Sequence, residues 1–313
     1  MPLITLYQSA SGPAYNAAYF LGLRFEEEEG FQPHDSEWWV MHTTPVDGKT
    51  KTSIQYGTSR WLTRIWRSPA GVAYVSDAEG EIHVNPDLRA SDSHARWTRH
   101  SFPCPIMGLW GLDDQSVYAW GSTPKVGFHV FRWDGKVWHD LPSPGFDVLD
   151  VHGAAPDLVY AVGVAGAVAR FDGRAWSRLA SPVNENLVSV FVASGDEQYA
   201  TGHRGSLLEG SASGWGKVAQ GPSTDWPLHA AVKWQGELWI AAGPFGLLKR
   251  AGTTSRLDAV KPKLRATALE GGEALVVTGD DMIAGTRDGK DFKAAAQGVL
   301  LSMRASKPLI DFT

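Results

Sequence analysis

A repeat of about 40 residues constrains this chain more than any other feature of its sequence. Within residues 146–218 the same pattern occurs twice. An apolar stretch that ends at Val151 and another that ends at Phe191 are each followed by a Tyr-Ala-x-Gly sequence, at 160–163 and 199–202. This alignment gives Val151 and Phe191 equivalent places, 40 residues apart. A period near 40 with several short strands in each unit is typical of the blades of a β-propeller.

Six such units follow one another between residues 59 and 298. Each unit begins with a short strand of alternating apolar and polar residues, followed by a polar or glycine-containing turn and a second strand. Short strands at this spacing fit blades of four antiparallel strands. The residues that we align in the six first strands are Trp66, Trp110, Val151, Phe191, Val232 and Leu269.

Two kinds of glycine turn recur inside the units. A Gly-x-x-Gly sequence follows the second strand at 163–166, 202–205 and 243–246. Glycine permits the positive φ that a tight hairpin requires, so these sequences predict turns rather than phosphate loops. An Asp-Gly pair, with an aromatic residue three positions after the glycine, lies at 134–135, 172–173 and 288–289. Turn chemistry accounts for these residues, and we predict a structural role for them.

The repeats predict an all-β chain in which residues 1–313 form a single β-propeller domain. Seven four-stranded antiparallel blades are the first choice and six the alternative. Residues 59–298 supply six explicit blades, whereas residues 1–58 look irregular and residues 299–313 resemble the first strands of a further unit. We therefore expect the N-terminal and C-terminal strands to share one closing blade, with residues 299–313 as its inner strands, because such sharing leaves no free sheet edge.

The combination of an alternating first strand, a Tyr-Ala-x-Gly-x-x-Gly hairpin and an Asp-Gly-x-x-Trp turn resembles the Ycf48-like and BNR (Asp-box-like) class of seven-bladed β-propellers. The resemblance covers about residues 60–313. The full Asp-box pattern, Ser/Thr-x-Asp-x-Gly-x-Thr-Trp, is met loosely, because Asp and Gly are adjacent here and Thr286 supplies the hydroxyl in one copy. Such families include sialidases, assembly chaperones of photosynthetic complexes and binding proteins. The resemblance therefore implies a fold rather than one activity.

Charge and composition narrow the functional classes. The formal net charge of −5 disfavours a nucleic-acid partner, because counterion release from a nucleic acid requires a basic surface. No apolar run reaches the length of about 18 residues that spans a bilayer, so we expect no membrane partner. The N-terminus lacks the pattern of a secretory signal, and Cys104 has no second cysteine to pair with. We expect a cytoplasmic bacterial protein.

Catalytic and metal-binding motifs are weak in this sequence. The ten histidines form neither His-x-His nor His-Glu-x-x-His, so we expect no metal and no cofactor. A sialidase requires an arginine triad and a Tyr/Glu pair, and its first arginine is announced by Phe/Tyr-Arg-Ile-Pro. Here Arg64 and Ile65 are kept while both flanking residues depart from that pattern. We predict no catalytic residue.

A partner site is expected on the side where hairpins between second and third strands meet the connections between blades, because function gathers on loops held by a rigid scaffold. Phe146, Trp226 and Phe245 have no folding reason to be exposed there, and with Arg204 they resemble interaction hot spots. Burial of each aromatic ring in its own loop is the alternative. The candidate partner-binding residues are Lys125, Phe146, Asn184, Asn186, His203, Arg204, Asp225, Trp226, Phe245, Asp280 and Asp281.

Three functions fit this reading. The first is a non-catalytic propeller that binds a protein partner through this loop face, as an assembly chaperone or as an immunity protein that neutralises a secreted toxin. The second is a carbohydrate-binding or sialidase-like, glycan-hydrolysing propeller that uses tryptophan stacking. The third is a structural subunit of a larger complex.

Overall fold

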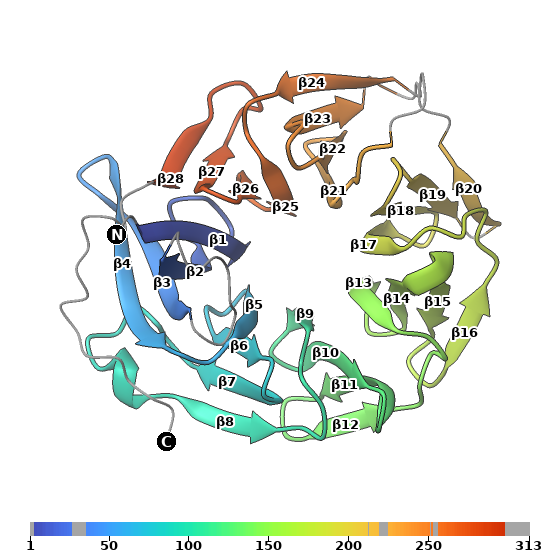
Figure 1. The fold of residues 1–313 in the computed structure, drawn as a ribbon, viewed down its shortest axis with the longest axis horizontal. Helices are drawn as coiled ribbons and strands as arrows, with labels where there is room; N and C mark the ends of the chain where they lie inside the picture. Colours follow the sequence, from blue (N-terminus) through green and yellow to red (C-terminus); the bar gives the residue numbers. More distant parts are fainter. Residues whose placement is uncertain are drawn as a thin grey trace. The chain divides into compact units, whose positions relative to one another are not determined.

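The computed structural model describes residues 3–26, 36–211, 213–218, 225–250, 252 and 256–297. These residues form seven four-stranded antiparallel sheets, which are the blades of a seven-bladed β-propeller (Figure 1). The chain divides into two compact units, here called unit 1 (residues 1–107 and 270–313) and unit 2 (residues 108–269). None of the helical segments in the described part of the chain is long and apolar enough to cross a membrane.

Unit 1 contains blade 1, blade 2 and most of blade 7, whose first strand begins in unit 2. A short 3₁₀ helix, η1 (Ser93–Ala95), precedes the last strand of blade 2. The strands of blade 1 are β1 (Leu3–Ser11), β2 (Tyr19–Glu26), β3 (Glu37–Val46) and β4 (Lys49–Thr58). Those of blade 2 are β5 (Leu62–Arg67), β6 (Ala73–Asp77), β7 (Glu81–Asn85) and β8 (Thr98–Ser101). Those of blade 7 are β25 (Ala266–Gly271), β26 (Leu275–Gly279), β27 (Met282–Thr286) and β28 (Lys293–Gln297).

Blade 1 corrects the prediction of a closing blade shared between the chain ends. Its four strands all come from residues 3–58, and each is eight to ten residues long. The segment looked irregular because its middle strands, β2 and β3, are buried on both faces, which removes the alternation that reveals a half-exposed strand. Trp39 packs with Val276 of blade 7, whereas the adjacent Trp38 packs with Ile65 of blade 2. The predicted inner strands at 299–313 lie outside the described residues.

Unit 2 contains the next four blades. Blade 3 consists of β9 (Gly108–Asp113), β10 (Ser116–Thr123), β11 (Gly127–Trp133) and β12 (Trp138–Leu141). Blade 4 consists of β13 (Val148–Ala155), β14 (Leu158–Gly163), the 3₁₀ turn η2 (Val164–Gly166), β15 (Val168–Phe171) and β16 (Trp176–Leu179). Blade 5 consists of β17 (Leu187–Ser194), β18 (Glu197–Gly202), β19 (Leu207–Ser211) and β20 (Gly214–Lys217). Blade 6 consists of β21 (Ala230–Trp234), β22 (Glu237–Ala241), β23 (Leu247–Arg250) and β24 (Leu257–Lys261).

The register of the first strands corrects the alignment of Val151 with Phe191. His152, not Val151, pairs with Tyr160, whereas Phe191 pairs with Tyr199. His152 and Phe191 are therefore the equivalent residues. The slip escapes notice in the sequence because the aromatic position is a histidine in β13 but lies within the apolar run 190–193 in β17, and both strands contain a bulge near their start.

His152 takes the place of an aromatic residue in a row that joins successive blades. Its imidazole lies 4.6 Å from the Trp110 ring and 4.9 Å from the Phe191 ring, centroid to centroid. The backbone N–H of Val192 donates to His152 Nδ1 at 3.1 Å, so Nδ1 carries no proton. Burial lowers the pKa of His152 to about 3, and the neutral ring therefore serves as packing between blades 3, 4 and 5.

The Asp-Gly pairs are turns, as predicted. In each one the Asp carboxylate accepts hydrogen bonds from two backbone N–H groups just ahead; for Asp172 the donors are Arg174 and Ala175, both at 2.9 Å. The glycine that follows has φ near +90° in two of the three turns. Trp176 packs on the core between blades 3 and 4, and Trp215 packs on the core between blades 4 and 5. Each of these tryptophans thus packs its own blade against the preceding blade.

Candidate functional site

In unit 2, the hairpins between second and third strands meet the connections between blades, as predicted. The Val164 N–H donates to the Asp147 carbonyl oxygen at 3.2 Å, the His203 N–H donates to that of Asn186 at 3.0 Å, and the Gly205 N–H donates to that of Trp226. We call these segments the loop surface. It comprises the hairpin residues 122–126, 163–166, 202–205 and 243–246 and the connections 142–147, 180–186, 225–229 and 262–265.

Glycine is required where these backbones meet. A Cβ on Gly166 would lie 2.0 Å from the carbonyl oxygen of Val183, and one on Gly202 would lie 2.2 Å from that of Asn186. Gly166 also has φ +69°, which side chains rarely adopt. The Gly-x-x-Gly sequences thus let each hairpin lie directly against the neighbouring connections, and the loops of four blades form one braced surface.

An exposed aromatic pair stands on this surface. Trp226, from the connection between blades 5 and 6, is 37% exposed, and Phe245, from the hairpin of blade 6, is 36% exposed. Their rings are stacked, with centroids 3.8 Å apart and 6° between the planes. Two large apolar side chains that shield each other yet remain accessible are unusual on a monomer and are typical of an interaction site.

Arg204 lies beside the pair, at the residue before Gly205, whose N–H binds the Trp226 carbonyl. Its side chain is 74% exposed and makes a long ion pair with Glu185, at 4.0 Å between Nη1 and Oε1. Arg204 has φ +51°, and Ala165, the same position in the hairpin of blade 4, has φ +54°. The hairpin geometry therefore holds a non-glycine residue in the left-handed region and presents its side chain outward.

The remaining predicted residues of unit 2 fall on the same surface with different roles. Lys125, Asn184, His203 and Asp225 are exposed. Asn186 is half-buried, and its Oδ1 accepts a hydrogen bond from the Ala165 N–H at 3.0 Å. Asn186 is thus a bracing residue between two loops as well as a neighbour of Arg204.

Phe146 was predicted to be an exposed loop aromatic, and the structure contradicts this. It is 5% exposed and belongs to the core between blades 3 and 4, with Val148 and Phe171. The Arg178 guanidinium covers its ring, with Cζ 4.6 Å from the ring centroid. The Asp147 carbonyl approaches Gly163 closely, and Phe146 folds under this contact into the space between the blades. Its role is packing.

Asp280 and Asp281 belong to unit 1, in the hairpin between β26 and β27. The Asp280 carbonyl oxygen accepts a hydrogen bond from the Tyr7 N–H at 2.8 Å. Burial first, and then the Asp281 charge, raises the pKa of Tyr7 to about 12. Asp280 thus contacts blade 1 and Asp281 acts on it through its charge, both within unit 1.

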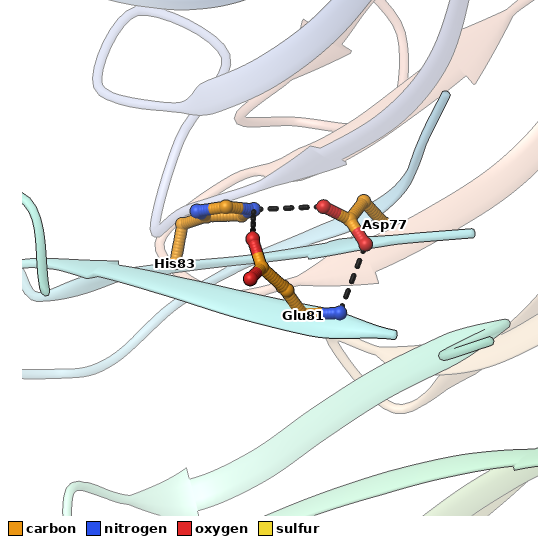
Figure 2. A group of neighbouring side chains, drawn as sticks. All are labelled: Asp77, Glu81 and His83. Atoms are coloured by element: carbon orange, nitrogen blue, oxygen red, sulfur yellow. Dashed lines mark hydrogen bonds and ion pairs between the residues drawn. The ribbon is translucent and has the colours of Figure 1, made fainter. Parts of the chain in front are cut away.

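A polar cluster in blade 2 was not foreseen from the sequence. Asp77, Glu81 and His83 point toward one another (Figure 2), and their ligand atoms all lie within 4.8 Å. His83 Nε2 lies 2.9 Å from Asp77 Oδ2, and Asp77 Oδ1 accepts the Glu81 N–H at 2.9 Å. The available signal was the alternation of Glu81 and His83 along β7, which puts both on one face of the sheet.

Arg60 supplies the positive charge of this cluster. Its Nε donates to Asp77 at 2.8 Å, and its Nη2 lies 2.9 Å from Glu81 and 3.0 Å from Glu79. Burial alone would raise the pKa of Asp77, but the hydrogen bonds from His83 and Glu81 and the Arg60 charge hold it below its usual range. A metal ion would have to compete with this guanidinium, so we assign the cluster to fixing the β6–β7 turn.

The sialidase-like reading rested on Arg64, which is half-buried on β5. The charge of Arg64 acts on a carboxyl group of the chain itself, that of Glu270. Glu270 Oε1, on β25, accepts hydrogen bonds from Ser11 Oγ at 3.3 Å and from the Gly12 N–H at 3.2 Å. Burial raises the pKa of Glu270 to about 7, against the lowering effects of these hydrogen bonds and of the charges of Arg64 and Arg67. The hydrogen bonds of Glu270 join blade 7 to blade 1.

No protein-family model matches the chain. One curated protein, "Immune protein Tsi7" of Pseudomonas aeruginosa, is 32% identical over 140 residues. The alignment covers 41% of this chain and 44% of that protein. The match thus spans less than half the length of either chain.

Several solved propellers resemble the chain along most of its length. YCF48 bound to a D1 peptide has a TM-score of 0.63 at 12% identity and covers 90% of this chain and 91% of its own. The WD40 propeller domain of Doa1 has a TM-score of 0.68 at 8% identity, covering 88% and 92%. Chaetomium thermophilum Sqt1, bound to the N-terminus of ribosomal protein L10, has a TM-score of 0.61 at 13% identity, covering 87% and 94%. The expected likeness to Ycf48 propellers is confirmed at the level of fold.

Proposed function

We propose that this chain is a non-catalytic, protein-binding β-propeller: an immunity protein that neutralises a toxin by binding it through the loop surface of unit 2. In this proposal the chain acts in the bacterial cytoplasm, without metal or cofactor. The partner is a folded protein, whose surface residues pack against Trp226 and Phe245.

The exposed stack of Trp226 on Phe245 carries this proposal. Each ring is over a third exposed although each would gain free energy from burial, and the surrounding loops are braced by backbone hydrogen bonds. A rigid aromatic anchor loses little conformational entropy on binding, which is the property of an interface hot spot. Arg204, with its exposed side chain, adds a second residue type that is enriched at such sites.

Different similar proteins support the two parts of the proposal, which are protein binding and the narrower role in immunity. The YCF48 and Sqt1 structures are propellers with a bound peptide or protein segment, which supports protein binding as a use of this fold. The partial match to an immune protein supports the narrower role in immunity. Neither support depends on a catalytic group in this chain.

A growth-protection assay tests the role. The genes that flank the gene for this chain are expressed one at a time in a bacterial host, and one of them should arrest growth. Co-expression of the wild-type chain should restore growth, whereas the chain with Trp226→Ala and Arg204→Glu should not. The purified toxin should bind the wild-type chain in a pull-down and fail to bind the double variant.

Two controls decide the interpretation. Arg174→Glu makes the same charge change on an exposed turn at the opposite ends of the strands, and it should leave protection intact. The double variant should keep the melting temperature of the wild type within a few degrees, since both side chains are exposed. Full protection by a folded double variant would move the binding site elsewhere. A flanking product that arrests growth regardless of the chain would remove the immunity role.

A further inference from the structure

The two ends of the strands in unit 2 differ in charge: one end is close to neutral and the other is strongly acidic. The loop surface holds four basic and three acidic residues, although the whole chain has a net charge of −5. The described turns at the other ends of the same strands (residues 113–115, 134–137, 155–157, 172–175, 194–197 and 235–237, and Arg256 before β24), here called the turn surface, hold eight acidic and three basic residues. An approaching acidic group is therefore repelled from the turn surface and admitted at the loop surface.

Two of the four basic residues of the loop surface, Arg204 and Lys263, lie in segments next to the aromatic pair. Arg204 lies on the side of Trp226, because the Gly205 N–H donates to the Trp226 carbonyl. Lys263, which is exposed, lies on the side of Phe245. The connection 262–265 runs against that hairpin, where a Cβ on Gly246 would lie 2.6 Å from the Pro262 Cα. The acidic residues nearby are Asp225 and Glu185, and Glu185 is already engaged with Arg204.

This arrangement sets the chemistry of the partner. An apolar side chain gains contact area against the exposed Trp226–Phe245 stack, and carboxylates on either side of it face Arg204 and Lys263. A basic segment would gain the same apolar contact but would be repelled by the like charges of Arg204 and Lys263. Arg204 in addition offers the planar donor group that binds a carboxylate in two hydrogen bonds.

We propose, building on the protein-binding function above, that the loop surface binds an acidic segment of its protein partner. An apolar side chain of that segment packs on Trp226 and Phe245, and carboxylates adjacent to it pair with Arg204 and Lys263. The loop surface thus selects its partner by charge as well as by apolar contact, and the acidic turn surface excludes the same segment from the far side of the unit.

Short fluorescent peptides test this selectivity on the full chain. Three peptides of equal length carry a central leucine flanked by glutamates, by lysines or by serines, and binding is followed by fluorescence anisotropy. The glutamate peptide should bind at least about tenfold more tightly than the lysine peptide, and added salt should weaken it, because its contacts are exposed charge pairs. The serine peptide should fall between them.

Charge-reversal variants show which residues produce the preference for the glutamate peptide. Arg204→Glu and Lys263→Glu should each weaken the glutamate peptide about tenfold or more, whereas Arg174→Glu, on the turn surface, should leave its affinity unchanged. Trp226→Ala should weaken the glutamate and serine peptides alike, since it removes the apolar contact.

Three results would overturn the inference. These are equal binding of the glutamate and lysine peptides, equal effects of Arg204→Glu and Arg174→Glu, and no binding of any peptide. The growth-protection assay separates this failure from failure of the proposed function. If Trp226→Ala abolishes protection while Lys263→Glu and Arg204→Glu singly do not, the loop surface binds a partner whose contact segment is not acidic.

Discussion

The indole ring of Trp226 lies parallel to the phenyl ring of Phe245, with centroids 3.8 Å apart and 6° between the planes. Trp226 comes from the connection between blades 5 and 6, and Phe245 comes from the hairpin between β22 and β23 of blade 6. Because both rings are over a third exposed, their contact stabilises the free protein only modestly and leaves apolar area for a partner.

A double-mutant cycle measures how this pair divides its effect between folding and binding. Trp226→Ala and Phe245→Ala should each lower the free energy of unfolding by about 1 kcal/mol, with a coupling of similar size between them. Each should lower toxin binding by about 2 kcal/mol or more, as expected of a hot spot. Denaturant unfolding and calorimetry give the two quantities. Val137→Ala removes an exposed apolar side chain from the turn surface and should affect neither; equal loss of binding in that variant would contradict the assignment.

Arg204→Gly separates side-chain function from backbone strain. With φ +51° at Arg204, glycine relieves a steric cost, so the free energy of unfolding should stay the same or rise by up to about 1 kcal/mol. Toxin binding should fall at the same time, because the guanidinium is lost. Ala165→Gly, at φ +54° in the hairpin of blade 4, should change stability in the same direction without changing binding. A destabilised Arg204→Gly variant would mean that the side chain itself supports the hairpin.

Gly166→Ala should destabilise the protein by about 2–4 kcal/mol. The new methyl group would meet the Val183 carbonyl oxygen at 2.0 Å, and the residue would have to keep φ +69°. Thermal unfolding followed by circular dichroism is the measurement. Gly216→Ala is the control, since no atom lies within 4 Å of its added Cβ, and it should change the free energy of unfolding by less than about 0.5 kcal/mol. Similar melting temperatures for the two variants would show that the loops are not braced in this way.

Glu270 should make stability depend on pH near neutrality. Its pKa is raised by burial to about 7 in the folded protein, so the folded state holds the proton more tightly than the unfolded state does. The stabilising contribution is complete below the pKa of the unfolded chain and is lost as pH rises through about 7. The melting temperature should therefore fall between about pH 5 and pH 8.

Glu270→Gln should flatten this pH dependence, because a neutral amide can still accept the hydrogen bonds from Ser11 and Gly12. The exposed Glu273→Gln variant should keep the slope of the wild type. A slope that survives Glu270→Gln would assign the effect to another group. The measurement is the melting temperature of the three proteins in a series of buffers at constant ionic strength.

Much of the fold could be predicted because its signals are local. An Asp carboxylate can accept hydrogen bonds from the backbone N–H groups two and three residues later in the chain. With a glycine at positive φ directly after the Asp, this defines a turn whatever surrounds it. Those turns and the spacing of the short strands were enough to predict six blades, and the structure contains them. Blade 1 was predicted poorly for the opposite reason. Its middle strands, β2 and β3, are covered by neighbours on both faces, and their sequences carry no alternating pattern.

The register of a strand was harder to predict from the sequence than the presence of the strand. The sequence alignment put Val151 in the place that His152 occupies, because the apolar run 190–193 of β17 fits the pattern in two registers. Only the pairing with Tyr160 and the contacts with Trp110 and Phe191 decide between them. A histidine in an aromatic row is invisible to a hydrophobic pattern, since the residue is polar by type and apolar only by virtue of its burial.

The sequence by itself determined the repeat, the turns and the side of the blades on which loops gather, because each of these follows from chemistry within a few residues. From the sequence alone, Phe146 and Trp226 were equivalent candidates for partner binding, because both are aromatic residues in connections between blades. The tertiary structure buried Phe146 between two sheets and left Trp226 stacked on Phe245 at the surface. That difference depends on how closely the preceding hairpin approaches each connection and on which residue of another blade faces the ring. These are contacts between segments far apart in the chain, which no local pattern encodes.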